Sequence, residues 1–164
     1  MPPPQGEDVR DQILKITDAN MQQAMKIRES GSPVASIYFF IQREEEGLQV
    51  AAMPVPPDVD PREFAKRAAD YAFQTSAMAV MSIHETWYTE GEDSVASQVW
   101  KAQGNSLKDF PGVKEGLIGA VDGVGINRLY LVEITPEGLG ELDVKDDAIV
   151  GGQMANISGR LGEI

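Results

Sequence analysis

Cysteine is absent from this chain of 164 residues, and histidine occurs once, as His84. Without cysteine there can be no disulfide framework, no thiolate nucleophile, no iron–sulfur cluster and no cysteine-ligated zinc. The pair His84-Glu85 resembles the start of a zinc-protease signature, but that signature needs a second histidine where this chain has Tyr88. The sequence therefore predicts neither a metal site nor a cofactor.

Basic residues and long apolar runs are also scarce. The chain has 14 Lys and Arg against 26 Asp and Glu, which gives a net charge of −12 with a neutral histidine. This charge repels phosphate polymers and anionic lipid headgroups, and no basic stripe with aromatic residues is present, so we expect no nucleic-acid binding. The uncharged segments 30–42 and 71–84 are shorter than the roughly 18 residues that span a bilayer, so we expect no membrane association. Residues 1–8 show no signal-peptide pattern, and a cytoplasmic location is the expectation.

The composition that is present fits a single domain over residues 1–164, because 42% of the residues are apolar and 24% are charged. We expect residues 1–6 to form a flexible N-terminus. Helical spacing predicts two main helices, over about 8–29 and 60–75, the second with Asp60 as N-cap and Pro61 at its first position. Alternating or continuously apolar patterns predict strands at 37–42, 48–53, 77–88, 113–121, 127–134 and 141–144. Adjacent strands with only two main helices indicate an α+β domain, with an antiparallel or mixed sheet of about five or six strands and both helices on one face.

The first predicted strand has two apolar faces. Ile37, Phe39 and Ile41 alternate with Tyr38 and Phe40, which are also large and apolar. Both faces should therefore be covered, one by a helix and the other by a second surface that a dimer partner could supply. This pattern favours self-association.

The segment 89–112 has little periodicity and is rich in Ser, Gly, Asn and charge. It is expected to be a long surface loop that could include a short helical turn, and loops of this length inside a domain are often functional or mobile.

Reactive side chains cluster only between Ser82 and Tyr88. A hydrolytic pair of His84 with a serine has no supporting G-x-S-x-G elbow, so no catalytic residue is assigned. Glu85 lies between apolar residues and must find a donor or shift its pKa; Arg128 and the Trp87 indole are conceivable partners. The candidate binding residues, which could line a pocket or an interface beside the 89–112 loop, are His84, Glu85, Trp87, Tyr88 and Trp100.

The second half of the chain resembles an uncharacterised family of small bacterial and phage-associated proteins. The resemblance is carried by the strand ending in Glu85-Thr86-Trp87, by Pro111, Glu115 and Leu117, and by the apolar strand 128–134. It implies a phage or prophage origin and no known activity.

Three functional hypotheses follow. The leading one is a non-enzymatic protein-interaction or assembly protein that binds a protein partner or itself. The alternative is a small-ligand binder or enzyme with a site near His84, Glu85 and Trp87. A third is an acidic DNA-mimic inhibitor of a basic protein, which would need carboxylates in two rows at the spacing of phosphates.

Overall fold

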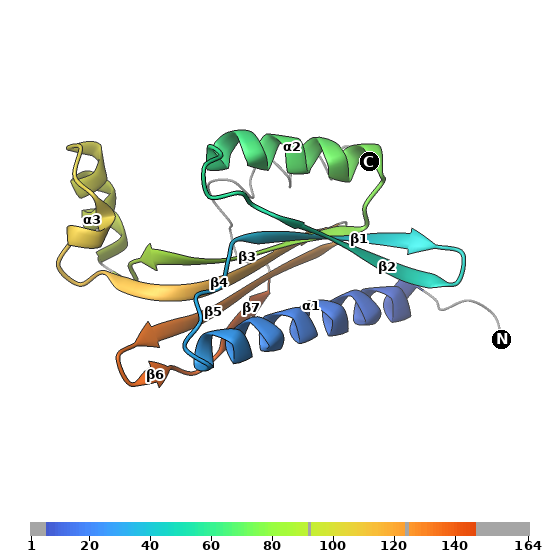
Figure 1. Ribbon diagram of the computed structural model, residues 1–164, viewed down its shortest axis with the longest axis horizontal. Coiled ribbons are helices and arrows are strands. Elements are labelled where there is room, and N and C mark those ends of the chain that lie inside the picture. The colour runs from blue at the N-terminus through green and yellow to red at the C-terminus, as the bar shows by residue number, and fades with distance from the viewer. Residues whose placement is uncertain (1–5, 92, 124, 147–164) are drawn as a thin grey trace.

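The computed structural model describes residues 6–91, 93–123 and 125–146. Within them the chain forms a single α+β domain, as the sequence predicts, with three α-helices and one antiparallel sheet (Figure 1). No helix of these described residues is long and apolar enough to cross a membrane. The elements in chain order are α1 (Gly6–Glu29), β1 (Ile37–Glu44), β2 (Gly47–Pro54), α2 (Pro61–Gln74), β3 (Ala79–Tyr88), α3 (Asp93–Ala102), the 3-10 turn η1 (Leu107–Asp109), β4 (Lys114–Gly123), β5 (Ile126–Thr135), β6 (Gly138–Leu139) and β7 (Asp143–Asp146).

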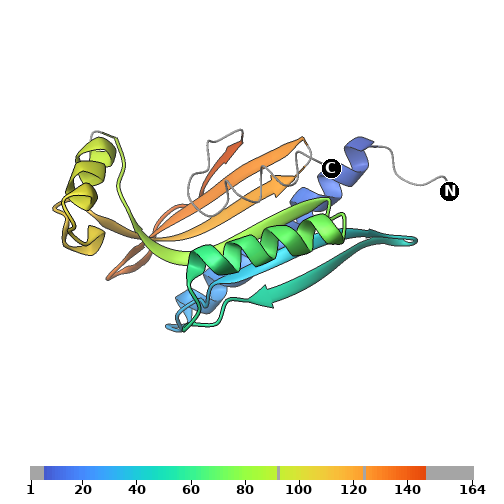
Figure 2. The same ribbon diagram turned by 90° about the horizontal axis from the view of Figure 1, so that it is seen from above.

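The sheet has seven strands in the order β2-β1-β3-β4-β5-β6, with β7 also paired to β5. All of its pairings are antiparallel. Viewed from above, β2 is the outermost strand on one side, and the short strand β7 lies beside β5 on the other (Figure 2). Two of the strands contain only two and four residues, so the estimate of five or six strands agrees with the main part of the sheet.

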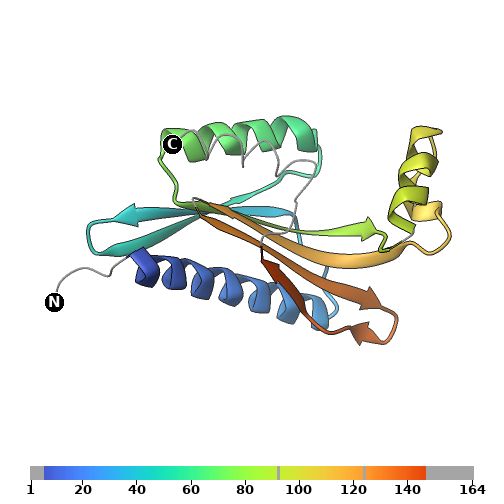
Figure 3. The ribbon, with the colours of Figure 1, turned by 180° about the vertical axis from the view of Figure 1, so that it is seen from behind.

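The two main helices lie on opposite faces of the sheet, and the prediction that they share one face is wrong (Figures 1 and 3). Ile41 and Ile83 belong to the core beneath α1, whereas Phe40 and Val80 belong to the core beneath α2. Alternation along each strand produces these two apolar faces. The second surface that Tyr38 and Phe40 require is therefore supplied by α2 of the same chain.

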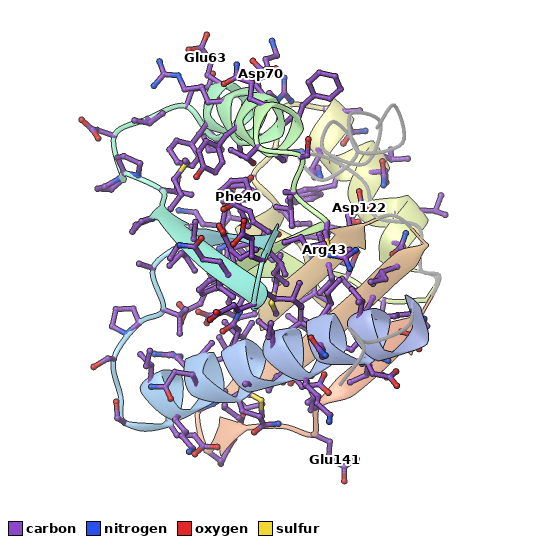
Figure 4. The ribbon with its side chains drawn as sticks, turned by 90° about the vertical axis from the view of Figure 1, so that its right-hand side faces the viewer. Phe40, Arg43, Glu63, Asp70, Asp122 and Glu141 are labelled. Atoms are coloured by element: carbon purple, nitrogen blue, oxygen red, sulfur yellow. The ribbon has the colours of Figure 1, made fainter. Side chains whose placement is uncertain are left out.

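Helix α2 begins where the sequence predicts, because Asp60 accepts a hydrogen bond from the Arg62 N–H at 3.0 Å. This is the second helical amide, whereas the capping-box pattern favours the third. Small alanines on the buried side bring the helix close to the sheet. In Figure 4, Phe40 lies between α2 and the sheet, whereas Glu63 and Asp70 lie on the side of the helix that faces away from it.

A polar cluster joins α1 to β5 and β7. The buried Tyr130 hydroxyl contacts Thr17 Oγ1 at 2.8 Å and donates to Asp18. Arg128 then bonds Asp146 Oδ1 at 2.7 Å and reaches Asp18 at 3.4 Å. These contacts fix the position of α1 across the sheet.

The segment 89–112 is not the long loop that we expect from the sequence, because it contains α3 and η1. The apolar periodicity is weak here because Val95 and Val99 face solvent, with 72% and 55% of their surface exposed, and so do not mark a core face. Trp100 instead packs edge-on against Phe110, and its indole donates to the Ser106 carbonyl at 2.8 Å. The expected flexible N-terminus lies, apart from Gly6, outside the described residues.

Candidate functional site

The candidate binding residues of β3 lie on two different faces of the sheet. Val80 belongs to the core beneath α2 and Ile83 to the core beneath α1. Because side chains alternate along β3, His84 and Tyr88 lie on the α2 side with Val80, whereas Glu85 and Trp87 lie on the α1 side with Ile83. The fifth candidate, Trp100, lies on α3 against Phe110. The structure therefore does not bring these five side chains together into one site.

Glu85 has a structural partner that the sequence does not reveal. Its Oε1 accepts the Val34 N–H at 3.0 Å and lies 3.5 Å from Arg28 Nε. Neither Arg128 nor the Trp87 indole fills this role, since Arg128 bonds Asp146 and Trp87 is 44% exposed. Glu85 therefore joins the end of α1 to the segment that leads into β1.

His84 is partly buried, and this burial lowers the pKa of its imidazole. The hydroxyl of Ser82, two residues away on the same face, is buried without a hydrogen-bond partner among the described residues. No serine–histidine hydrogen bond of the kind that activates a nucleophile is therefore formed here.

Tyr88 lines an open pocket of about 260 Å³ on the α2 side of the sheet. Its ring lies over Gly116, where an added Cβ would come within 2.6 Å of a ring carbon. Lys114 bridges Glu90 at 3.3 Å and Glu133 at 3.5 Å in the same pocket. Burial first, and then Glu90 and Glu133, raise the pKa of Tyr88 above its usual value. The pocket therefore holds a surface cluster of ion pairs beside the Tyr88 ring.

The free edge of β2 is a feature that the sequence pattern does not single out. Among the described strands, β2 pairs only with β1, through a register in which Glu44 lies opposite Gly47 across a two-residue turn. In such a hairpin the odd-numbered residues of β2 bond to β1, and the 2.9 Å bond from the Val55 N–H to the Ser36 carbonyl continues this pattern. The backbone N–H and C=O groups of Leu48, Val50 and Ala52 therefore point away from the sheet. We call these three residues the β2 edge.

The two edges of the sheet differ in charge. The whole of β2, Gly47–Pro54, contains no charged residue, whereas the four residues of β7 include Asp143, Lys145 and Asp146. Charges and short strands on an edge prevent pairing with other chains, and a long uncharged edge permits it. Among the described strands, β7 is both short and charged, whereas β2 is neither.

An apolar pocket of about 420 Å³ lies on the α1 side of the sheet. Helix α1 packs over β3 and β4, and the pocket opens between its second half and β1. Phe39, which lines it, pairs with the exposed Ala52 of the β2 edge on the same face. We call this cavity the α1 pocket.

Comparisons with known proteins give no match to a family model, a curated protein or a solved structure. Within the part of the chain that the structure describes, no group of three or more His, Asp or Glu side chains is placed to hold a metal ion.

Proposed function

We propose that this chain is a non-enzymatic, cytoplasmic protein-interaction or assembly protein, of phage or prophage origin, that self-associates through the β2 edge. The observation that carries the proposal is the exposed, eight-residue, uncharged strand at one side of the sheet. Unpaired N–H and C=O groups on such a strand form hydrogen bonds readily with a strand from another chain. The phage origin is supported by the resemblance around Glu85-Thr86-Trp87.

A second copy of the chain fits this edge in one self-complementary register. An antiparallel pairing about a two-fold axis at Val50 places the two Val50 residues opposite each other and Leu48 opposite Ala52 of the second copy. All three residues use their outward-facing backbone groups, so the pairing leaves the bonds between β1 and β2 intact. Because successive residues alternate between faces, these three side chains form one continuous apolar strip across the axis.

Charge favours a second copy over a basic partner at this edge. No like charges would be placed opposite each other, because the strand has none. A partner chosen by the acidity of the chain would instead bind where carboxylates gather, and β2 offers no carboxylate.

The proposal is tested by measuring the mass of the full chain in solution by analytical ultracentrifugation across a range of concentrations. We expect a dimer, and we expect Val50→Lys to raise its dissociation constant about tenfold or more, because two ammonium groups would then face each other at the axis. Val144→Lys is the matched control, since Val144 is 43% exposed on the opposite edge and Val50 is 38% exposed. The control should dimerise at least as tightly as the unmodified chain.

A second variant separates backbone pairing from side-chain charge. Val50→Pro removes an N–H that points away from β1, and edge strands tolerate proline at such positions. We expect this variant to keep its circular dichroism spectrum and to be monomeric. A monomeric unmodified chain would contradict the proposal, and so would equal weakening by Val50→Lys and Val144→Lys.

A further inference from the structure

The α1 pocket has two walls and a floor, which come from separate parts of the chain. Helix α1 supplies one wall, the segment 33–35 supplies the second, and strands β1 and β3 supply the floor. Its volume of about 420 Å³ is within the range of small-molecule sites. The floor residues are Ile37, Phe39 and Ile83.

None of the described residues that line this pocket is charged, although the chain as a whole carries a net charge of −12. Glu85 contacts the lining residue Val34. Its carboxylate already accepts the Val34 N–H and pairs with Arg28. An ionic ligand would lose its hydration without gaining a counter-ion. The pocket therefore favours a neutral molecule.

One buried polar atom in the lining has no hydrogen-bond partner among the described residues. The Nδ2 atom of Asn20 is buried and forms no hydrogen bond with any described residue. An unpaired buried amide costs free energy, and a half-turn about the last side-chain torsion exchanges its N–H₂ and C=O ends. Because Nδ2 is enclosed, a molecule in the pocket can accept from it only after this half-turn has brought the N–H₂ end to the pocket side.

We infer that the α1 pocket binds a small, neutral and largely apolar molecule that carries a hydrogen-bond acceptor such as a ketone, ester or alcohol oxygen. The apolar part lies on Ile37, Phe39 and Ile83, and the acceptor faces Asn20. This inference does not depend on self-association, because the pocket walls come from a single chain.

The test uses Prodan, a neutral naphthalene ketone whose fluorescence shifts to shorter wavelength in an apolar site. We expect saturable binding to the full chain with this shift, and weaker binding of the anionic dye anilinonaphthalene sulfonate. Ala35→Trp should weaken Prodan binding about tenfold or more, because Ala35 is an exposed residue of the pocket lining that can carry a bulky ring without disturbing the core. Ala96→Trp is the matched control, since Ala96 is exposed on α3 and does not line the pocket.

A second variant tests the role of the acceptor. Asn20→Leu keeps a side chain of similar shape and removes the amide, so we expect it to weaken Prodan binding about three- to tenfold while leaving the thermal unfolding temperature unchanged or higher. An aromatic hydrocarbon of similar size should bind equally well to both forms. The inference is overturned if Prodan binding does not saturate, if Ala35→Trp and Ala96→Trp bind it equally, or if the anionic dye binds more tightly. Equal binding of Prodan before and after Asn20→Leu would overturn the role of the acceptor.

Discussion

His84 is the only histidine in the chain, so its titration can be followed without interference. Burial lowers the pKa of this imidazole in the folded protein, whereas the unfolded chain should titrate near the ordinary value of about 6.5. The folded state therefore binds the proton more weakly than the unfolded state. The contribution of His84 to the free energy of unfolding is fully present above pH about 6.5 and is lost as the pH falls through the folded pKa.

We expect the ring-proton NMR signals of His84 to give a pKa below 6.5 in the folded protein and near 6.5 in concentrated urea. Urea unfolding should show stability decreasing from pH 7 to pH 5, and His84→Gln should make this decrease smaller. A folded-state pKa at or above the value in urea would contradict the burial of this ring.

Single residues differ in how far the sequence determines their environment. The cap at Asp60 can be predicted because the donor and the acceptor are only two residues apart. Which of the first amides donates to it cannot be predicted from the sequence. The partner of Glu85 cannot be predicted from the sequence, because Arg28 approaches Glu85 only after α1 has packed across the sheet. The candidate site at His84, Glu85, Trp87, Tyr88 and Trp100 rests on proximity in sequence, and strand alternation separates its members.

At the scale of elements, Gly123 controls how closely the last residue of β4 approaches the first residue of β3. A Cβ at this position would lie 2.6 Å from the Met78 carbonyl oxygen and 2.9 Å from the Ala79 Cβ. Because the first contact is with backbone, the neighbour cannot rotate away. Gly123→Ala should therefore lower the free energy of unfolding by about 1–3 kcal/mol.

Gly140→Ala provides the control for this substitution, since its nearest contacts would be at 3.7 Å. It should change stability by less than about 0.5 kcal/mol in the same urea titrations. Equal effects of the two substitutions would show that the close approach at Gly123 has no energetic weight.

A helix or strand can be predicted where neighbouring residues carry its pattern. The position of that element in the fold cannot be predicted in this way. The predicted strands 77–88 and 127–134 are confirmed nearly in full, because alternation and turn residues are properties of neighbouring positions. Helix α3 is missed because its exposed valines break the usual relation between apolar residues and a core face. The sequence shows that Tyr38 and Phe40 must be covered, but only the packing of the chain shows that α2 covers them.

At the scale of the whole molecule, the net charge of −12 opposes the association of two copies. The β2 edge contains no charged residue, so the pairing that we propose has no ion pairs between its strands for salt to weaken. The remaining electrostatic effect is the repulsion between two acidic molecules. Salt screens this repulsion, since the Debye length falls from about 30 Å at 0.01 M to about 8 Å at 0.15 M ionic strength.

We therefore expect the dissociation constant of the dimer to decrease as sodium chloride is added over this range, in sedimentation experiments at constant pH. An interface made by oppositely charged side chains would respond in the opposite direction. Dissociation promoted by salt would thus exclude the β2 edge as the main contact and would indicate an interface that contains ion pairs. Val144→Lys, which adds one positive charge outside the proposed interface, should reduce the size of the salt effect and preserve its direction.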